Sequence, residues 1–507
     1  MIGTTSYEQA VADFSWEQLW SLFDGDREHL NIAHECLDRH PPDRVAARIA
    51  HADGAREHLS FGELSCATSQ CAHLLEDIGI AAGDRVAVMM QPSAGFYTSL
   101  FGAIKRGAVA VPLYTLFGPD AVRDRMDDCE AACLIVDAET APALRDSPYR
   151  VLQFETDVAP LLGAYRERYA PQTTSRDLAV LQYTSGTSRQ LPEAVRHDHR
   201  AIVTLARAGL FALGLHESDR YFCPSSPAWG HGLWHGTIAP WSIGVALGSF
   251  SGRFAIEPLI DALVDLRITN LAAASTIYRM ILRSGRLGEL TALTKASYTG
   301  EELDPWAQQD FLEATGTSVR GMYGTTETGV VLGNYPGFSD YEPRIGALGK
   351  PLPGCELVVL DAEGNEVAAN VTGELAVKRR GQWFRSKDLS RIDGDGYFWY
   401  AGRADDVIIA SGWTISPVEV ERTLLQHADV VEAAVIGVPD ELRGAIVKAV
   451  LVANRNDEEL VAELQRMVRG QLSPHEYPRE IEFVDALPKT ANGKVNRRAL
   501  RDVQQAG

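Results

Sequence analysis

An alternation of apolar strands with an amphipathic helix constrains the fold most strongly. The stretch GDRVAVMMQPSAGFYTSLFGAIKRGAVAVPLY predicts a strand at Val86–Met90, a helix that begins near Ser93 and ends before Gly107, and a second strand at Val109–Val111. This order is a βαβ unit, whose strands are parallel. A helix at about Pro119–Asp128 and the apolar runs ACLIVDA and RITNLAAAS continue the pattern. We therefore expect an α/β fold of mostly parallel sheets covered by helices.

The last hundred residues have a different pattern of predicted helices and strands, which indicates a small α+β domain. In SPVEVERTLLQ, Ser416 is the expected N-cap, Pro417 the first helical residue and Glu419 the partner in a capping box. The alternating runs VEAAVIGV and GAIVKAVLV, a helix at Asp457–Leu472 and the strand EIEFV follow. We place the domain boundary at Asp405.

Length and composition narrow the class of protein. A chain of 507 residues exceeds one compact core, so we expect a large N-terminal domain at 1–404 and a small C-terminal domain at 405–507. The net charge of −20 and the lack of basic runs argue against nucleic acid as a partner. Seven cysteines without CxxC spacing predict neither disulfides nor a zinc site. No signal-peptide or membrane-spanning pattern is present, so a cytoplasmic protein is expected.

The stretch YTSGTS has the residue types of a phosphate-binding loop. Gly186 lets the backbone approach a ligand, while Thr184, Ser185, Thr187 and Ser188 offer hydroxyl groups beside backbone N–H groups. A polar surface loop would have the same composition, so this stretch by itself is weak.

Three later stretches carry charged residues suited to a nucleotide. In GMYGTTETG, Glu327 follows two threonines and would suit Mg²⁺, which binds one or two carboxylates together with phosphate oxygens. Asp388 could accept both hydroxyls of a ribose, and Arg403 could donate to the ribose or to phosphates. Lys494 lies in the basic tail LPKTANGKVNRRALR. The alternatives are a solvated turn, a hairpin and a surface lysine.

Taken together, the order and spacing of these stretches resemble the adenylate-forming superfamily of acyl-CoA synthetases, carrier-protein adenylation domains and luciferases. YTSGTS is similar to its phosphate loop, TGEEL and MYGTTETG to its adenine and magnesium motifs, GRADDVIIASGWTISPVEVE to its hinge, and LPKTANGKVNRRALR to its terminal lysine motif. The resemblance covers nearly the whole chain. SPHEYPREIEFVDALPKT and GYFWYAGRADDVIIASG most resemble medium-chain and aromatic acyl-CoA synthetases.

The resemblance implies the site residues. For ATP these are Thr184, Ser185, Gly186, Thr187, Ser188, Gly300, Glu301, Glu302, Tyr323, Gly324, Thr325, Asp388 and Arg403; for catalysis, Lys494, Thr326 and Glu327, the last also as the magnesium ligand; for the acyl group, Trp229, His231, Trp234 and Gly324; for CoA, Ser411, Gly412, Trp413 and Arg443; and for the hinge, Asp405. Gly324 stands where acetate-activating relatives carry tryptophan, which implies room for a longer acid.

The phosphate loop departs from the family pattern TSGTTGxPK. Arg189 replaces the second glycine, one residue is inserted, and Glu193 stands where lysine is expected. This departure removes a cation from the polyphosphate. Arg189 or Arg196 could replace it, because guanidinium groups bind phosphate well, and Arg189 is closer to the hydroxyl residues.

The implied activity is that of an acid:CoA ligase. ATP and Mg²⁺ activate a medium-chain, alicyclic or aromatic carboxylic acid as an acyl-adenylate, and CoA takes the acyl group as a thioester. The alternatives are an enzyme that loads a carrier protein, a non-catalytic module that binds a nucleotide or an acyl-adenylate, and a luciferase-like oxidase. The sequence leaves the identity of the acid and the oligomeric state open, with a homodimer among the alternatives.

Overall fold

The computed structural model describes residues 6–506 except 146, 184–193, 301–302, 326, 405, 411–412, 441–443, 473–475 and 490–494. The chain divides into two compact units. The first contains Met1–Thr299, Ala307–Pro343 and Leu352–Gly354, and the second contains the remaining residues.

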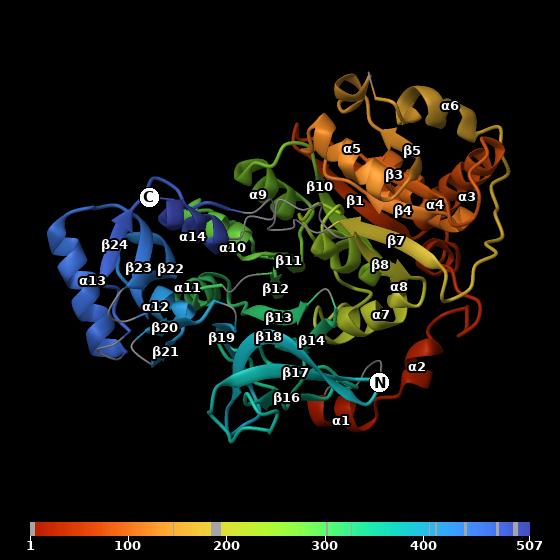
Figure 1. The fold of residues 1–507 in the computed structure, drawn as a ribbon. Coiled ribbons are helices and arrows are strands. Elements are labelled where there is room, and N and C mark those ends of the chain that lie inside the picture. The colour runs from red at the N-terminus through yellow and green to blue at the C-terminus, as the bar shows by residue number, and fades with distance from the viewer. Residues whose placement is uncertain are drawn as a thin grey trace. The chain divides into compact units, whose positions relative to one another are not determined.

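The first unit is built on a six-stranded sheet with the order β6-β5-β3-β4-β7-β8 (Figure 1). Neighbouring strands are parallel, except that β8 runs antiparallel to β7. The strands are β3 (Arg85–Met89), β4 (Val109–Pro112), β5 (Ala131–Val136), β6 (Val151–Gln153), β7 (Leu178–Tyr183) and β8 (Ala194–Asp198).

Helices cover both faces of this sheet because its strands are apolar on both sides. Val86 and Val88 of β3 pack with α3 (Phe61–Asp77) and α4 (Ala94–Arg106), while Ala87 and Met89 pack with α5 (Pro119–Asp128). Ser93 caps α4 by accepting from the Phe96 N–H at 3.1 Å, and Gly107 ends it with a φ of +83°. The predicted βαβ unit and the α/β fold class are confirmed.

Two further sheets complete the first unit. In one, parallel strands β9, β11, β12 and β13 adjoin β14, which is antiparallel to β13; in the other, β1 lies between β2 and β10. The strands are β1 (Val45–His51), β2 (Arg56–Ser60), β9 (Tyr221–Phe222), β10 (Leu247–Ser251), β11 (Asn270–Ala274), β12 (Lys295–Thr299), β13 (Val319–Thr325) and β14 (Gly329–Gly333).

The remaining helical segments are mostly short. They are α1 (Tyr7–Ala12), α2 (Trp16–Trp20), α6 (Ala159–Leu162), α7 (Ala201–Phe211), α8 (Ala239–Ser242), α9 (Ile256–Asp265), α10 (Ser275–Arg283) and α11 (Pro305–Thr315), with the π-helical segments η1 (His34–Asp38), η3 (Phe154–Val158) and η4 (His231–Ile238) and the 3₁₀ turns η2 (Ala141–Leu144) and η5 (Leu287–Glu289). No helix in the described ranges is long and apolar enough to cross a membrane.

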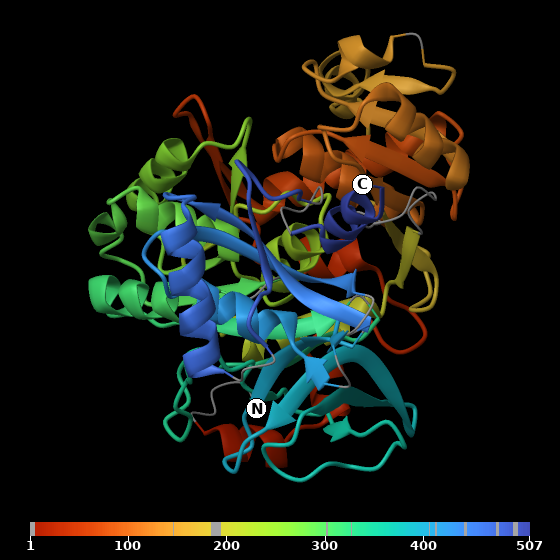
Figure 2. The same ribbon diagram turned by 60° about the vertical axis from the view of Figure 1, so that its left-hand side comes forward.

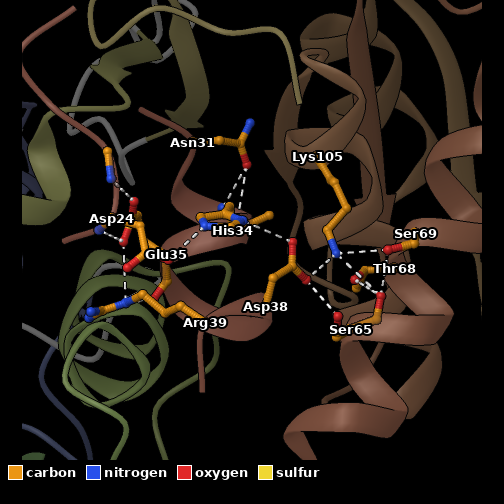
Figure 3. A network of polar contacts seen from close by, with 12 residues as sticks. Asp24, Asn31, His34, Glu35, Asp38, Arg39, Ser65, Thr68, Ser69 and Lys105 are labelled. Carbon is orange, nitrogen blue, oxygen red and sulfur yellow. Dashed lines mark hydrogen bonds and ion pairs between the residues drawn. The ribbon is translucent and has the colours of Figure 1, made fainter. Parts of the chain in front are cut away.

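A buried polar network joins η1 to α3 and α4 (Figure 3). Lys105 has no exposed surface, and its Nζ donates to Asp38 Oδ1 at 2.6 Å, to Ser69 Oγ at 3.1 Å and to the Ser65 carbonyl at 3.2 Å. His34 Nδ1 lies 3.4 Å from the other carboxylate oxygen of Asp38. All three ammonium hydrogens therefore have acceptors, which a buried lysine requires.

The second unit contains an antiparallel sheet β16-β17-β18-β19, a hairpin β20-β21 and a sheet β22-β23-β24. Its elements are β15 (Lys350–Pro351), β16 (Leu357–Leu360), β17 (Gly373–Arg379), β18 (Gln382–Ile392), β19 (Phe398–Arg403), β20 (Ile408–Ala410), β21 (Trp413–Ile415), α12 (Pro417–Leu424), β22 (Val430–Asp440), β23 (Gly444–Ala453), α13 (Glu458–Gln471), β24 (Glu480–Phe483) and α14 (Arg497–Ala506). Figure 2 shows α13 alongside the blue strands, where Leu460, Leu464 and Val468 join the core.

The predicted start of α12 at Pro417 is confirmed, but the predicted capping box is wrong. Ser416 is the N-cap, yet its hydroxyl accepts no N–H from the helix. It donates instead to the Ala401 carbonyl at 2.5 Å, a tertiary contact that local spacing could not reveal. The boundary at Asp405 stays a prediction, since Asp405 lies outside the described residues and Cys355–Arg403 also belong to the second unit.

Candidate active site

The hairpin β13–β14 positions the residues expected near adenine and magnesium. Thr325 pairs with Gly329, and the Thr325 N–H donates to Thr328 Oγ1 at 3.1 Å, so the turn closes on its own hydroxyls. Glu327 lies in this turn and is exposed, with its carboxylate available to solvent or a ligand. Thr326 lies outside the described residues. The turn therefore presents a single carboxylate beside threonine hydroxyls.

Gly324 meets a packing requirement that the sequence did not show. Gly324 pairs with Val330, and a Cβ added at Gly324 would lie 2.1 Å from the Gly329 carbonyl oxygen. Any side chain here must move the backbone of β14. That glycine leaves room for the acid stays a prediction. Because a tryptophan at this position would also displace β14, the activity of a Gly324→Trp variant would not report on pocket size alone.

Trp229, His231 and Trp234 come together around η4. Trp234 is buried, its Nε1–H donates to Gln182 Oε1 at 2.8 Å, and its ring centroid lies 4.3 Å from that of His197. The Trp229 ring lies 5.4 Å from the His231 ring in an edge-to-face arrangement. Pairing of Val180 with His197 and of Gln182 with Val195 puts Gln182 and His197 on one face of β7–β8.

The histidines of this aromatic cluster (Gln182, His197, Trp229, His231, Trp234 and His235) are neutral. Burial lowers the pKa of His231 to about 3, helped by the neighbouring His235, and burial lowers the pKa of His235 and of His197 to about 4. Ser225 Oγ lies 2.9 Å from His231 Nδ1. The cluster therefore combines aromatic surface with uncharged polar groups, a composition common in sites for small organic ligands.

Sequence reasoning missed Gln182, His197 and His235. His197 and Gln182 flank the atypical phosphate loop, and their alternation along β7 and β8 is the signal that could have found them. His235 follows His231 at a spacing of four, and a π-helical segment such as η4 is itself frequent at functional sites.

Asp388 and Arg403 are brought together in the second unit. They are directly opposed on β18 and β19, with Arg403 Nη1 3.5 Å from Asp388 Oδ1. Asp388 is 6% exposed, whereas the Arg403 side chain is partly exposed. The pKa of the Tyr400 hydroxyl is raised by burial and by the Asp388 carboxylate. This pair is compatible with the expected ribose contacts.

Backbone hydrogen bonds and an ion pair hold the segments on either side of Lys494 within the second unit. Lys489 and Val495 form an antiparallel bridge, and the Asn496 N–H donates to the Pro488 carbonyl at 2.7 Å. Arg497 Nη2 then binds both carboxylate oxygens of Glu421, at 2.8 and 2.6 Å.

Asp406, which follows the predicted hinge residue, pairs with two arginines of α14. Arg501 Nη2 donates to Asp406 Oδ1 at 2.8 Å, and Arg497 Nη1 lies 4.0 Å from Asp406 Oδ2. The start of α14 is therefore fixed by α12 and by the residue that follows Asp405.

Several predicted site residues lie outside the described residues. They are Thr184, Ser185, Gly186, Thr187, Ser188, Arg189, Glu301, Glu302, Thr326, Asp405, Ser411, Gly412, Arg443 and Lys494. Gly300 directly follows β12 with a φ of +99°, which suits glycine, and Trp413 opens β21. No group of three or more His, Cys, Asp or Glu residues suited to a metal ion occurs among the residues that were placed.

The chain is similar to several ligases along nearly its whole length. Residues 34–384 match the family described as AMP-binding enzyme, and residues 419–494 match the AMP-binding enzyme C-terminal domain. An acetyl-coenzyme A synthetase of Bacillus subtilis (strain 168) is 32% identical, over 98% of this chain and 94% of that protein.

Two solved structures share both sequence and fold with this chain. An anthranilate CoA ligase in complex with anthranoyl-AMP is 29% identical, with a TM-score of 0.84 over 95% of this chain and 98% of that one. A benzoate CoA ligase from Burkholderia xenovorans LB400 is 28% identical, with a TM-score of 0.82 over 93% of this chain and 100% of that one.

Proposed function

Because the chain belongs to the AMP-binding enzyme family, we propose that it is an acid:CoA ligase for a medium-chain, alicyclic or aromatic carboxylic acid. The predicted family and activity are confirmed: the chain is an AMP-forming acyl-CoA synthetase, which activates an acid with ATP and forms a thioester with CoA. The choice of acid is the part that we propose.

The aromatic cluster around η4 carries the proposal for the acid. Trp229, His231 and Trp234 offer flat surfaces, which favour planar or alicyclic rings over a two-carbon acid. Two similar enzymes are named for ring-bearing acids, anthranilate and benzoate, and one was solved with the corresponding acyl-adenylate.

Charge governs the first half-reaction, in which a carboxylate approaches an α-phosphate. We assign Lys494 to neutralise both groups in the transition state, with Thr326 beside the phosphates. The loss of one such preorganised contact costs about 3 kcal/mol of barrier, or roughly a hundredfold in rate.

Magnesium fits the turn between β13 and β14. Glu327 is an exposed carboxylate beside threonine hydroxyls, and Mg²⁺ binds one or two carboxylates together with phosphate oxygens. When bound, the ion offsets charge on the pyrophosphate that leaves. The proposed contribution of this chain is therefore one carboxylate oxygen rather than a closed cage.

We assign Arg189 to replace the cation that is absent from the phosphate loop. The other candidate, Arg196, is opposite Leu181 in the β7–β8 ladder. Successive strand residues face opposite sides, so Arg196 lies on the side of the sheet away from Gln182 and His197. This placement leaves Arg189, inside the loop, as the better candidate.

The second half-reaction requires another surface. We propose that the C-terminal domain rotates about Asp405, which withdraws Lys494 and brings Ser411, Gly412 and Trp413 to the CoA channel, with Arg443 near the CoA nucleotide.

The location and the oligomeric state of the protein are also proposals. The seven cysteines are free thiols, which is consistent with the reducing cytoplasm that we propose as its location. A homodimer is the oligomeric state that we propose to test by light scattering.

A ligation screen tests the proposed function. Purified enzyme is supplied with ATP, Mg²⁺ and CoA and with aliphatic, alicyclic and aromatic acids, and acyl-CoA is measured by mass spectrometry. We expect the highest kcat/KM for acids with at least six carbons. A preference for acetate would refute the assignment of the acid, and thioester formation only on a carrier protein would refute CoA as the acceptor.

Three variants test the residue roles. Lys494→Ala is expected to abolish acyl-adenylate formation and to spare thioester formation from supplied acyl-adenylate; equal loss in both steps would contradict its role. Arg189→Ala is expected to raise the KM for ATP or to slow single-turnover adenylation roughly tenfold, whereas Glu193→Lys should be neutral or beneficial. Unchanged kinetics in Arg189→Ala would leave the cation unassigned.

A further inference from the structure

Three imidazole nitrogens in the aromatic cluster are buried without a hydrogen-bond partner. They are His197 Nε2, His231 Nε2 and His235 Nδ1. Buried polar atoms are nearly always paired, because an unpaired one loses its hydrogen bonds to water without replacement. His231 and His235 are neighbouring rings, so their two unpaired nitrogens point to one group that completes both.

The geometry of the cluster favours a ring-bearing occupant with a polar group. His231 is 4% exposed, and its Nδ1 is already engaged with Ser225, so Nε2 is the nitrogen left over. The His231 and His235 ring centroids are 5.9 Å apart. Rings at this separation are close enough for one small polar group between them to hydrogen-bond to both.

The charge state of the rings defines the chemistry of that polar atom. Burial depresses the pKa of all three histidines, so each ring is neutral near pH 7 and offers one N–H donor and one acceptor. A hydroxyl also donates once and accepts, so it can match the rings in either tautomer. A charged ammonium or carboxylate would be buried without a counter-ion and is disfavoured.

We propose that the acid carries an uncharged hydroxyl substituent away from its carboxylate, and that His231 and His235 bind this substituent while Trp229 and Trp234 contact the ring. His231 and His235 are then specificity-determining residues, and Gln182 is a positioning residue that orients Trp234 through their 2.8 Å hydrogen bond. This inference rests on the proposed function, because it places the acid at this cluster.

Matched pairs of acids test the inference. The kcat/KM for acid-dependent exchange of pyrophosphate into ATP is measured for benzoate against its three monohydroxy isomers and for cyclohexanecarboxylate against its hydroxylated forms. We expect at least one hydroxylated acid to exceed its parent by about tenfold or more, since a site built to bind a hydroxyl discriminates strongly against its absence.

Variants then locate the discrimination. His231→Phe and His235→Phe keep an aromatic ring and remove the nitrogens. In each variant, kcat/KM for the preferred hydroxylated acid is expected to differ from that for its parent acid by no more than roughly twofold. His58→Phe makes the same change at an exposed position of β2 and should leave the ratio unchanged. Circular dichroism confirms that each variant is folded, and the second histidine variant replaces the first if one fails to fold.

The outcomes separate the two proposals. Exchange with several acids but no preference for a hydroxylated one would overturn the inference and leave the ligase function intact. A preference that survives both histidine variants would also overturn it. No exchange with any acid would overturn the proposed function and, with it, this inference.

Discussion

Replacing Arg497 with methionine tests the ion pair that holds the start of α14. Glu421 has only 10% of its side chain exposed; it accepts from the Val435 N–H at 2.7 Å and binds Arg497 through both oxygens. Burial raises the pKa of the Glu421 carboxyl, and the Arg497 guanidinium opposes that rise. Without Arg497, a buried carboxylate keeps one backbone donor and no counter-charge.

The expected loss of stability follows from that geometry. Removing one partner of a buried pair costs about 3–5 kcal/mol, and the retained Val435 N–H places Arg497→Met near the lower end. Replacing both partners, as in Glu421→Leu/Arg497→Met, should recover most of the loss, because no buried charge is then left unpaired.

A double-mutant cycle measures the coupling between the two residues. The midpoints of urea unfolding of the full chain, followed by fluorescence and by circular dichroism, are compared for the wild type, both single variants and the double variant. If the losses of unfolding free energy in the two single variants add up in the double variant, the coupling energy is below about 1 kcal/mol. That result would refute the expected coupling and place the pair among weak surface contacts.

Three further predictions concern the first unit. Lys105→Met should lower the free energy of unfolding by about 3–5 kcal/mol because Asp38 loses its cation, whereas the exposed Lys378→Met should cost less than about 1 kcal/mol; similar urea midpoints would contradict this. Because the folded pKa of His231 is about 3, below its ordinary value near 6.5, the unfolded chain takes up the proton first as pH falls, so stability is complete above about pH 6.5 and declines below it. The wild type should lose about 2 kcal/mol more than His231→Phe between pH 7 and pH 5, and parallel pH profiles would argue against a buried neutral ring. Gly324→Ala should impair pyrophosphate exchange because its Cβ meets the Gly329 carbonyl, whereas Gly118→Ala, with open space at its Cβ, should not; equal activity would show that β14 yields at little cost.

Local sequence determined the elements of this protein and the chemistry of its motifs. Ser93 and Gly107 bound α4 where capping preferences place them, and Pro119 and Pro417 begin their helices as predicted. Such features depend on residues within one turn, so a reader of the sequence can find them. The ordered motifs from YTSGTS to LPKTANGKVNRRALR likewise indicated the family, because each keeps its residue types together in the chain.

Only the tertiary structure decided which distant groups meet. Gln182 and Trp234 are bonded across 52 positions, and Arg497 binds Glu421 across 76. The same dependence explains the missed contact of Ser416 with Ala401 and the crowding of Gly324 by the neighbouring strand. The burial that neutralises His231 and leaves its Nε2 unpaired is a property of the packed core. A sequence lists such groups without their surroundings, and in a protein the surroundings set protonation and hydrogen bonding.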